Sequence, residues 1–136
     1  MKRYLLATSA LLTLRDNEAG ADQVADILCQ AQEGKALCFG CFMSLMEVLY
    51  RVWKDESEQA GRLAYQQCLS LPIEWLREHP ALLEKAAEIK ATHSLSLADA
   101  WIAASVLLKG AVLVHKDPEF VGLACQQLEL PYKKGV

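Results

Sequence analysis

The stretch SLADAWIAASVLLKGAVLV, residues 96–114, joins a helix to a strand with a sharp boundary. Ser96 and Asp99 resemble a capping box ahead of an Ala-rich helix, and Gly110 is a typical residue to end it. The next four residues, Ala111 to Val114, form a continuous apolar run that is typical of a fully buried strand. The stretch therefore predicts a helix that leads directly into the interior of a sheet.

The same alternation of helix and strand extends along the rest of the chain. Short apolar runs without polar alternation predict strands at residues 4–7, 36–39, 73–76, 111–114 and 128–130. Apolar spacings of three and four, with capping and breaking residues, predict helices that begin near residue 10 and cover 20–33, 43–54, 56–69, a segment from 80, 96–109 and a short segment from 117. This pattern predicts an α/β fold with a parallel central sheet covered on both faces.

The composition fits one compact domain over residues 1–136. Hydrophobic residues make up 53% of the chain and charged residues 23%, which excludes a disordered chain and a multispan membrane protein. The apolar run from Tyr4 to Leu14 resembles a secretory signal, but the charged stretch 15–18 disfavours one, and a buried strand entering a helix explains the same residues. The net charge of −3 gives no global sign of nucleic-acid binding, although a local basic rim can still hold phosphates.

The odd number of cysteines indicates reduced thiols in a cytoplasmic protein, not a disulfide framework. The five stand at Cys29, Cys38, Cys41, Cys68 and Cys125. Cys38-Phe-Gly-Cys41 is a CxxC motif, but the sequence offers no second ligand pair for zinc. A redox dithiol is one interpretation of this motif, and two small apolar residues at the end of a buried strand is the interpretation we favour.

Three carboxylates and two hydroxyls are expected at one edge of the predicted sheet, because the carboxyl ends of parallel strands meet there. Asp117 follows the strand 111–114, Asp99 begins the helix that leads into that strand, and Glu47 lies in the helix after the strand 36–39. Thr8 and Ser9 follow the first strand. Oxygen ligands of this kind suit Mg²⁺ or Mn²⁺, which would orient the attack of water on a phosphodiester.

Each of these residues also has a purely structural explanation. Asp117 before Pro118 is a good N-cap, and Asp99 in a capping box complements the helix dipole. Glu47 is spaced to pair with Arg51 one helical turn later. Thr8 and Ser9 are good residues to cap the helix expected near residue 10. Only their joint occurrence at one sheet edge points to a metal site.

Four segments in this order resemble the PIN domain family, specifically the VapC-type toxins of type II toxin–antitoxin systems. These segments are YLLATSALL at 4–12, MSLMEVLYR at 43–51, SLSLADAWIAA at 94–104 and VLVHKDPEF at 112–120. The resemblance covers essentially the whole chain. It implies a three-layer α/β/α fold with a parallel sheet, a metal-dependent endoribonuclease activity, and an antitoxin partner that blocks the acidic site.

The resemblance also assigns roles to individual residues. Glu47, Asp99 and Asp117 match three acidic metal ligands of the family, and Thr8 and Ser9 match the hydroxyls after its first strand. The family places a fourth acid immediately before Thr-Ser-Ala, where this chain has Ala7, and it commonly has a small hydroxyl residue where this chain has His115. Loss of the carboxylate at position 7 removes two ligand oxygens, so the resemblance implies an RNA-cleaving toxin that is impaired in this chain.

Ala7 leaves several hypotheses open. An engineered inactivation, made to obtain a toxic nuclease in quantity, and a naturally silenced family member both account for it. The leading hypothesis is an impaired nuclease of single-stranded or looped RNA, with Lys116 and Arg51 as the best phosphate contacts or as solvated surface charges. The alternative is a catalytically silent module that binds antitoxin or RNA without cleavage.

The helices between residues 43 and 71 carry more large apolar side chains than one buried stripe needs. These are Met43, Leu49, Tyr50, Trp53, Leu63, Tyr65, Leu69 and Leu71. An exposed apolar patch usually marks an interface, so we expect a homodimer and an antitoxin bound across the helices that follow Gly40. A monomer that packs these side chains internally is the alternative.

Overall fold

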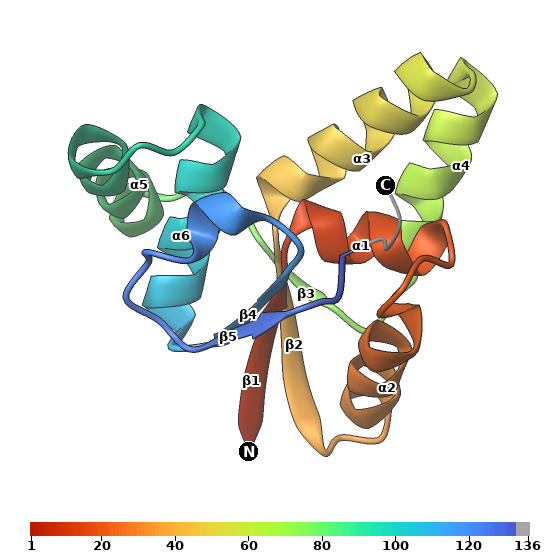
Figure 1. Ribbon diagram of the computed structural model, residues 1–136, viewed down its shortest axis with the longest axis horizontal. Helices are drawn as coiled ribbons and strands as arrows, with labels where there is room; N and C mark the ends of the chain where they lie inside the picture. The colour runs from red at the N-terminus through yellow and green to blue at the C-terminus, as the bar shows by residue number, and fades with distance from the viewer. Residues whose placement is uncertain (133–136) are drawn as a thin grey trace.

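A computed structural model describes residues 1–132 and contains a five-stranded parallel sheet with helices on both faces (Figure 1). The strand order is β3-β2-β1-β4-β5. The strands are β1 (Lys2–Leu6), β2 (Ala36–Cys41), β3 (Glu74–Leu76), β4 (Val112–His115) and β5 (Gln127–Glu129). The helices are α1 (Thr8–Arg15), α2 (Ala21–Gln32), α3 (Phe42–Asp55), α4 (Glu58–Leu69), α5 (Pro80–Thr92), α6 (Leu97–Lys109) and the 3₁₀ helix η1 (Pro118–Phe120). The predicted α/β class and parallel sheet are confirmed.

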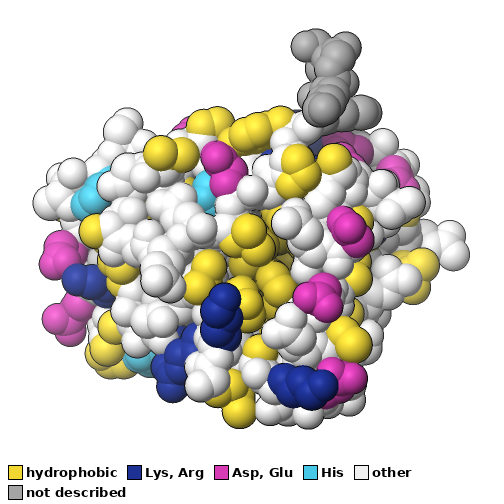
Figure 2. Space-filling model, turned by 60° about the horizontal axis from the view of Figure 1, so that its bottom comes forward, with side chains coloured by type: hydrophobic (Ala, Val, Ile, Leu, Met, Phe, Trp, Pro, Cys, Tyr) yellow, Lys and Arg dark blue, Asp and Glu magenta, His cyan; other side chains and the backbone are white. Residues whose placement is uncertain are grey.

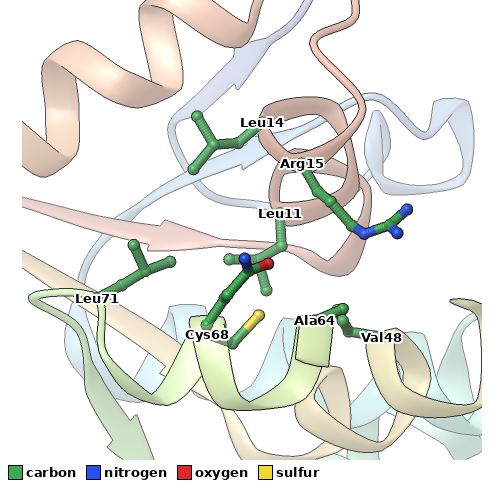
Figure 3. Close-up of a pocket in the computed structure, with 8 residues that line it drawn as sticks. Leu11, Leu14, Arg15, Val48, Ala64, Cys68 and Leu71 are labelled. Atoms are coloured by element: carbon green, nitrogen blue, oxygen red, sulfur yellow. The ribbon is translucent and has the colours of Figure 1, made fainter. Parts of the chain in front are cut away.

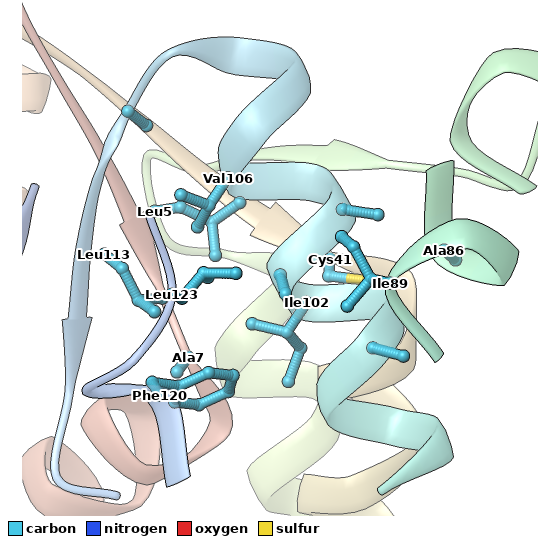
Figure 4. Packing of buried hydrophobic residues seen from close by; sticks show 14 of the residues in the cluster. Leu5, Ala7, Cys41, Ala86, Ile89, Ile102, Val106, Leu113, Phe120 and Leu123 are labelled. Carbon is cyan, nitrogen blue, oxygen red and sulfur yellow. The ribbon is translucent and has the colours of Figure 1, made fainter. Parts of the chain in front are cut away.

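Two hydrophobic clusters, one on each face of the sheet, make the three-layer arrangement. Successive side chains of a strand point to opposite faces, so Leu6 packs with α1, α2, α3 and α4 while Leu5 packs with α5 and α6. Both leucines are fully buried. Figure 4 shows the cluster that packs with α5 and α6. In it, Ala7, which follows β1, lies next to Phe120 at the end of η1. Burial on both faces explains why the strands are uniformly apolar.

The register of the sheet brings the ends of β1, β2 and β4 to one edge. Leu5 pairs with Phe39 in β2, and Leu6 pairs with Val114 in β4. The chain runs from β1 to β2 on one side and returns to β4 on the other, so the strand order reverses at β1. Such a reversal leaves a crevice beyond the carboxyl ends of the strands. The segments after β1 and β4 and the start of α3 and α6 surround this crevice.

The start of α1 differs from the sequence expectation. The helix begins at Thr8, and Ala7 occupies the N-cap position without a side-chain hydrogen bond. The prediction that Thr8 or Ser9 caps this helix is therefore wrong, because both residues lie inside its first turn. The short helix after β4 is confirmed in place, but it is a single 3₁₀ turn capped by Asp117, whose Oδ1 accepts from the Glu119 N–H at 3.0 Å.

The CxxC motif spans the sheet instead of presenting two thiols to each other. Cys38 belongs to the cluster under α1–α4, whereas Cys41 belongs to the cluster under α5 and α6 (Figure 4). Burial raises the pKa of Cys38 to about 12 and also raises the pKa of Cys41. A redox dithiol needs adjacent thiols with a lowered pKa, so this interpretation of the motif is wrong.

Gly40 has a steric role between the two cysteines. It pairs with Trp75 across β2 and β3, and a Cβ added at Gly40 would lie 2.4 Å from the Trp75 ring. The indole therefore covers the backbone of β2, a close approach that only glycine allows.

Among residues 1–132, no helix is long and apolar enough to cross a membrane. Figure 2 shows one face on which hydrophobic side chains gather near the middle, with basic and acidic side chains interspersed around them.

Candidate metal centre

Three carboxylates gather at the edge of the sheet where α6 begins and β4 ends. Oxygen atoms of Asp99, Asp117 and Glu119 all lie within 4.8 Å of one another. Asp99 is held in the first turn of α6, whose N-cap Ser96 accepts from the Asp99 N–H at 3.1 Å. Asp117 and Glu119 are fixed by the 3₁₀ turn that Asp117 caps. Asp99 and Asp117 therefore stabilise the starts of their helices and also lie in the cluster of carboxylates. Their capping roles do not compete with a role in metal binding.

Glu47 lies on the other side of the same cavity, in a hydrogen-bonded setting of its own. Thr8 Oγ1 donates to Glu47 Oε1 at 2.6 Å and lies 2.9 Å from Ser44 Oγ. Because a hydroxyl has one proton, Ser44 must be the donor to Thr8 when Thr8 donates to the carboxylate. Arg51 Nη2 lies 3.7 Å from Glu47 Oε2, the ion pair expected from the spacing. Thr8 therefore orients a carboxylate and does not cap its helix.

Glu47, Asp99 and Asp117 line one small cavity, and Glu119 lies close to Asp99 and Asp117 without lining it. Its volume is about 30 Å³, and its walls come from the segment after β1, from α3, from α6 and from the turn after β4. The lining residues are Ala7, Thr8, Ser9, Glu47, Arg51, Asp99, Ile102, Asp117 and Phe120. Ala7 is 1% exposed and points its methyl group toward Phe120 in the apolar wall (Figure 4). A space of this size accommodates one water molecule or the carboxylate that Ala7 lacks.

Ser9 and Lys116 make hydrogen bonds that connect segments of the fold. Ser9 Oγ accepts from the Lys116 N–H at 2.9 Å and so fastens α1 to the end of β4. Lys116 Nζ donates to the Ala19 carbonyl at 2.9 Å and lies 3.5 Å from Glu18. The Lys116 side chain is only 12% exposed. Its ammonium group is directed to the loop between α1 and α2, which leaves Arg51 as the cation beside the acids.

His115 is a fully buried anchor for the segment that carries Asp117 and Glu119. The Asp117 N–H donates to His115 Nδ1 at 3.0 Å, so the ring proton is on Nε2, which donates to Gln127 Oε1 at 2.8 Å. The Gln127 amide in turn donates to the carbonyls of Phe120 and Leu123. His115 and Gln127 thus connect β4 and β5 to the acidic turn, a role that no sequence motif predicts.

An excess of negative charge is the main electrostatic feature of the cavity, in which three carboxylates face one cation, Arg51. Burial raises the pKa of the Asp99 carboxyl to about 7, and the charges of Asp117, Glu119 and Glu47 add to this shift. A divalent cation would relieve this repulsion, and oxygen donors are the ligands that Mg²⁺ and Mn²⁺ prefer. The residues present therefore fit a hard divalent metal.

Glu119 is the site residue that the sequence reasoning missed. It follows Asp117 by two residues in Asp-Pro-Glu. It was not predicted as a site residue because a short helical turn usually directs such side chains to solvent. The Asp-Pro start of the turn was the available signal, because an N-cap carboxylate that accepts from the N–H of the residue two positions later holds those two residues close together.

Comparison with known families gives this architecture a name. A profile of the PIN domain matches residues 4–124. The chain belongs to the PIN domain family. A sequence comparison with curated proteins gave no match.

Solved structures agree with this PIN fold despite low sequence identity. VapBC2 from Rickettsia felis, bound to a DNA fragment from its promoter, has a TM-score of 0.75 at 16% identity and covers 95% of this chain and 99% of that chain. VapC20 from Mycobacterium tuberculosis, a sarcin–ricin loop cleaving toxin, has a TM-score of 0.72 at 19% identity, with coverage of 94% and 99%. A toxin–antitoxin complex from Klebsiella pneumoniae has a TM-score of 0.59 at 22% identity, with coverage of 89% and 92%. This PIN domain thus has a VapC-like toxin fold.

Proposed function

We propose that this PIN domain is a metal-dependent endoribonuclease toxin of a toxin–antitoxin pair, impaired in this chain by Ala7. The observation that carries the proposal is that Glu47, Asp99 and Asp117 line one cavity at the switch point of the sheet, with Glu119 within 4.8 Å of Asp99 and Asp117. The VapC-like fold supports the choice of RNA as substrate and of an antitoxin as partner.

The chemistry divides among the residues of the cavity. Asp99, Asp117 and Glu119 would hold Mg²⁺ or Mn²⁺, with Glu47 facing them, and the ion would supply charge stabilisation for the hydrolysis of a phosphodiester. Thr8 holds Glu47 in place through its hydroxyl. Ser9 and His115 position the turn that bears Asp117. Ile102 and Phe120 close the inner wall against water.

Ala7 removes one carboxylate from the centre of this arrangement. Its position at the end of β1 lies between Glu47 on one side and Asp117 on the other. An acid here would bridge the two groups of carboxylates and complete a site for a metal-bound water. We therefore expect metal binding to persist in weakened form and RNA cleavage to be low.

The test is the variant Ala7→Asp with Ala7→Asn as the matched neutral control. Gel analysis of total cellular RNA with Mn²⁺ should show cleavage by Ala7→Asp, at least 100-fold above both Ala7→Asn and the parent chain. A chelator should abolish this cleavage. If Ala7→Asp binds Mn²⁺ yet leaves every tested RNA intact, the proposed nuclease activity is wrong.

The second candidate function is a silent PIN module that binds antitoxin or RNA without cleavage. Ala7 favours it, because the surrounding site is otherwise intact and the apolar packing against Phe120 accommodates the methyl group. The codon at position 7 of the source gene separates the two: alanine in the genome supports the module, and aspartate supports an altered nuclease.

An apolar pocket between α1 and α4 is the proposed docking place of the antitoxin. It has a volume of about 220 Å³ and is lined mainly by Leu11, Leu14, Val48, Ala64, Cys68 and Leu71 (Figure 3). Arg15 stands at its rim. The pocket is formed partly by α3 and α4, which follow Gly40, and partly by α1, which precedes it. Exposed Leu63 and Leu69 on α4 extend the apolar surface beside it.

A homodimer is proposed on the opposite side of the molecule. A shallow apolar groove of about 410 Å³ runs between α5 and α6 and includes Leu83, Leu97 and Trp101. Leu97 is 64% exposed and Leu83 is 46% exposed, which is unusual for adjacent large side chains. Light scattering at low protein concentration should give the mass of two chains, and Leu97→Glu should reduce it to one. A monomeric parent chain contradicts the proposal.

The small domain and its partners are expected in the cytoplasm.

A further inference from the structure

The imidazole of His115 makes hydrogen bonds in two directions just before the acidic turn. His115 is the last residue of β4 and is fully buried. Its Nδ1 accepts from the Asp117 N–H at 3.0 Å, and its Nε2 lies 2.8 Å from Gln127 Oε1. A side chain that accepts from the N–H two residues later forms the pattern of an Asx turn, made here by an imidazole. The bond fixes the direction in which the chain leaves β4 toward Asp117.

Gln127 holds the far end of the same turn. It is the first residue of β5, the edge strand that pairs with β4. Its Nε2 donates to the Phe120 carbonyl at 2.7 Å and to the Leu123 carbonyl at 3.2 Å. The two side chains therefore hold the turn at both ends, through a backbone N–H at its start and a backbone carbonyl at its end.

The His115 ring also supports the apolar wall of the cavity. The centroids of the His115 and Phe120 rings lie 5.3 Å apart with an interplanar angle of 71°, which is an edge-to-face contact. Phe120 is 1% exposed and lies next to Ala7 in the cavity wall (Figure 4). One buried ring thus contacts both the backbone that carries an acid and the wall behind that acid.

The acidic turn needs support from outside itself. It is a single 3₁₀ turn of three residues, Pro118–Phe120, and such a short turn has few hydrogen bonds of its own. Its carboxylates, on Asp117 and Glu119, have oxygen atoms within 4.8 Å of an Asp99 oxygen. Like charges at this distance repel one another, which favours movement of the turn away from α6. Bonds that hold the turn in place therefore set the spacing of the acids before an ion binds.

We propose that His115 and Gln127 are positioning residues for the metal centre. Their hydrogen bonds keep Asp117 and Glu119 at ligand distance from Asp99 in the metal-free protein, and this raises the affinity for a divalent cation. The decisive atom is His115 Nδ1. The inference rests on the proposed function and extends the control of its site to β5, a strand that contributes none of the described residues that line the cavity.

The experiment separates the two ring nitrogens with two variants. His115→Asn places a carbonyl oxygen at the position of Nδ1 and keeps the acceptor for the Asp117 N–H, whereas His115→Gln places an amide nitrogen at the position of Nε2 and keeps only the donor to Gln127. Isothermal titration calorimetry with Mn²⁺ on the full chain measures the affinity. His115→Asn should stay within about threefold of the parent, and His115→Gln should bind about tenfold more weakly. Gln127→Met, which removes both polar groups of Gln127, should cost about fivefold.

This order distinguishes positioning from packing. Asparagine is smaller than glutamine, so loss of packing alone would make His115→Asn the more damaging variant. Val24→Ala is the matched control, because Val24 is fully buried in the cluster on the other face of the sheet. It should lower the unfolding temperature and leave the Mn²⁺ affinity unchanged. Weaker binding by His115→Asn than by His115→Gln, or equal affinity of the parent, His115→Gln and Gln127→Met, overturns the proposal.

A second measurement needs no variant. A long-range ¹H–¹⁵N spectrum of the parent chain at neutral pH reports which ring nitrogen of each histidine carries the proton, and the contact with Phe120 assigns the signals of His115. We expect the proton on Nε2 and none on Nδ1. A proton on Nδ1 overturns the proposal, because a protonated nitrogen cannot accept from the Asp117 N–H.

The failure of this inference and the failure of the nuclease proposal give different results. If the parent binds Mn²⁺ and the His115 and Gln127 variants bind it equally well, only the positioning role is wrong. If the variants follow the expected order but Ala7→Asp cleaves no RNA, the nuclease is wrong and the positioning role stands. A parent chain that binds no Mn²⁺ contradicts both the metal centre and its positioning.

Discussion

The two sides of the acidic cavity use carboxylates in opposite ways. On the α3 side, Glu47 is held by the Thr8 hydroxyl and faces Arg51, so its charge is balanced by the protein itself. On the α6 side, none of Asp99, Asp117 and Glu119 forms an ion pair within residues 1–132, and the pKa of Asp99 rises to about 7. The difference indicates which side depends on an added metal. The carboxylates on the α6 side repel one another, whereas the carboxylate on the α3 side already has a hydrogen-bond donor and a cation.

The largest expected effect is on metal affinity. Asp99→Asn should weaken Mn²⁺ binding by about 100-fold, because it removes a charged ligand from the crowded side, whereas Glu47→Gln should weaken it by only about tenfold. Isothermal titration calorimetry on the parent and both variants makes the comparison. Equal losses for the two variants contradict the division of the cavity into two unlike sides.

The second expected effect concerns the satisfied side. Thr8→Val keeps the shape but removes the hydrogen bond to Glu47, and the buried carboxylate then loses its nearest donor. The free energy of unfolding should fall by about 2 kcal/mol. Thr8→Ser is the matched variant: it keeps the hydroxyl and loses one methyl group, at a cost of about 0.8 kcal/mol. Denaturant titrations in which Thr8→Ser is as damaging as Thr8→Val would show that the hydroxyl is unimportant.

The third effect is a pH dependence of stability in the metal-free protein. The pKa of Asp99 is about 7 when folded and about 3.9 when unfolded, so the folded chain binds more protons between these values. Its contribution to the free energy of unfolding therefore falls as pH rises from 4 to 7. Asp99→Asn should match the parent near pH 3 and exceed it by about 1–2 kcal/mol at pH 8, after allowance for solvent screening of a half-exposed carboxyl.

Glu84→Gln, on the exposed side of α5, is the control, and its free energy of unfolding should not diverge from that of the parent as the pH rises. Saturating Mn²⁺ should reverse the order of the parent and Asp99→Asn at pH 8, because the metal binds only the carboxylate form. Parallel pH profiles for the parent and Asp99→Asn would disprove the stored repulsion.

The smallest effect separates two neighbouring hydroxyls. Ser9→Ala removes the acceptor for the Lys116 N–H and should lower the free energy of unfolding by about 1 kcal/mol, while Mn²⁺ affinity stays within about twofold of the parent. Thermal unfolding and calorimetry on the same samples measure both quantities. A large loss of metal affinity would place Ser9 among the groups that hold the ion.

The outline of the site could be predicted from the sequence, but its internal division could not. Asp99, Asp117 and Glu47 follow or precede apolar runs whose burial fixes them as parallel strands, and parallel strands bring their ends to one edge. The proximity of Glu119 to the other acids depends on the fold of a short turn. The balancing of the Glu47 charge by its neighbours depends on how two helices face each other. No local pattern encodes those distances.

The α/β class, the parallel sheet and the caps at Ser96 and Asp117 follow from local sequence, because spacing and burial on both faces leave few other solutions. Tertiary structure alone decided the destinations of the polar side chains. Thr8 contacts Glu47 across 39 residues, Ser9 contacts Lys116 across 107, and His115 reaches Gln127 on the next strand. It also placed Cys38 and Cys41 on opposite faces of the sheet. Backbone periodicity is a local property of the chain, whereas a hydrogen bond is chosen by whichever partner the completed fold brings within about 3 Å.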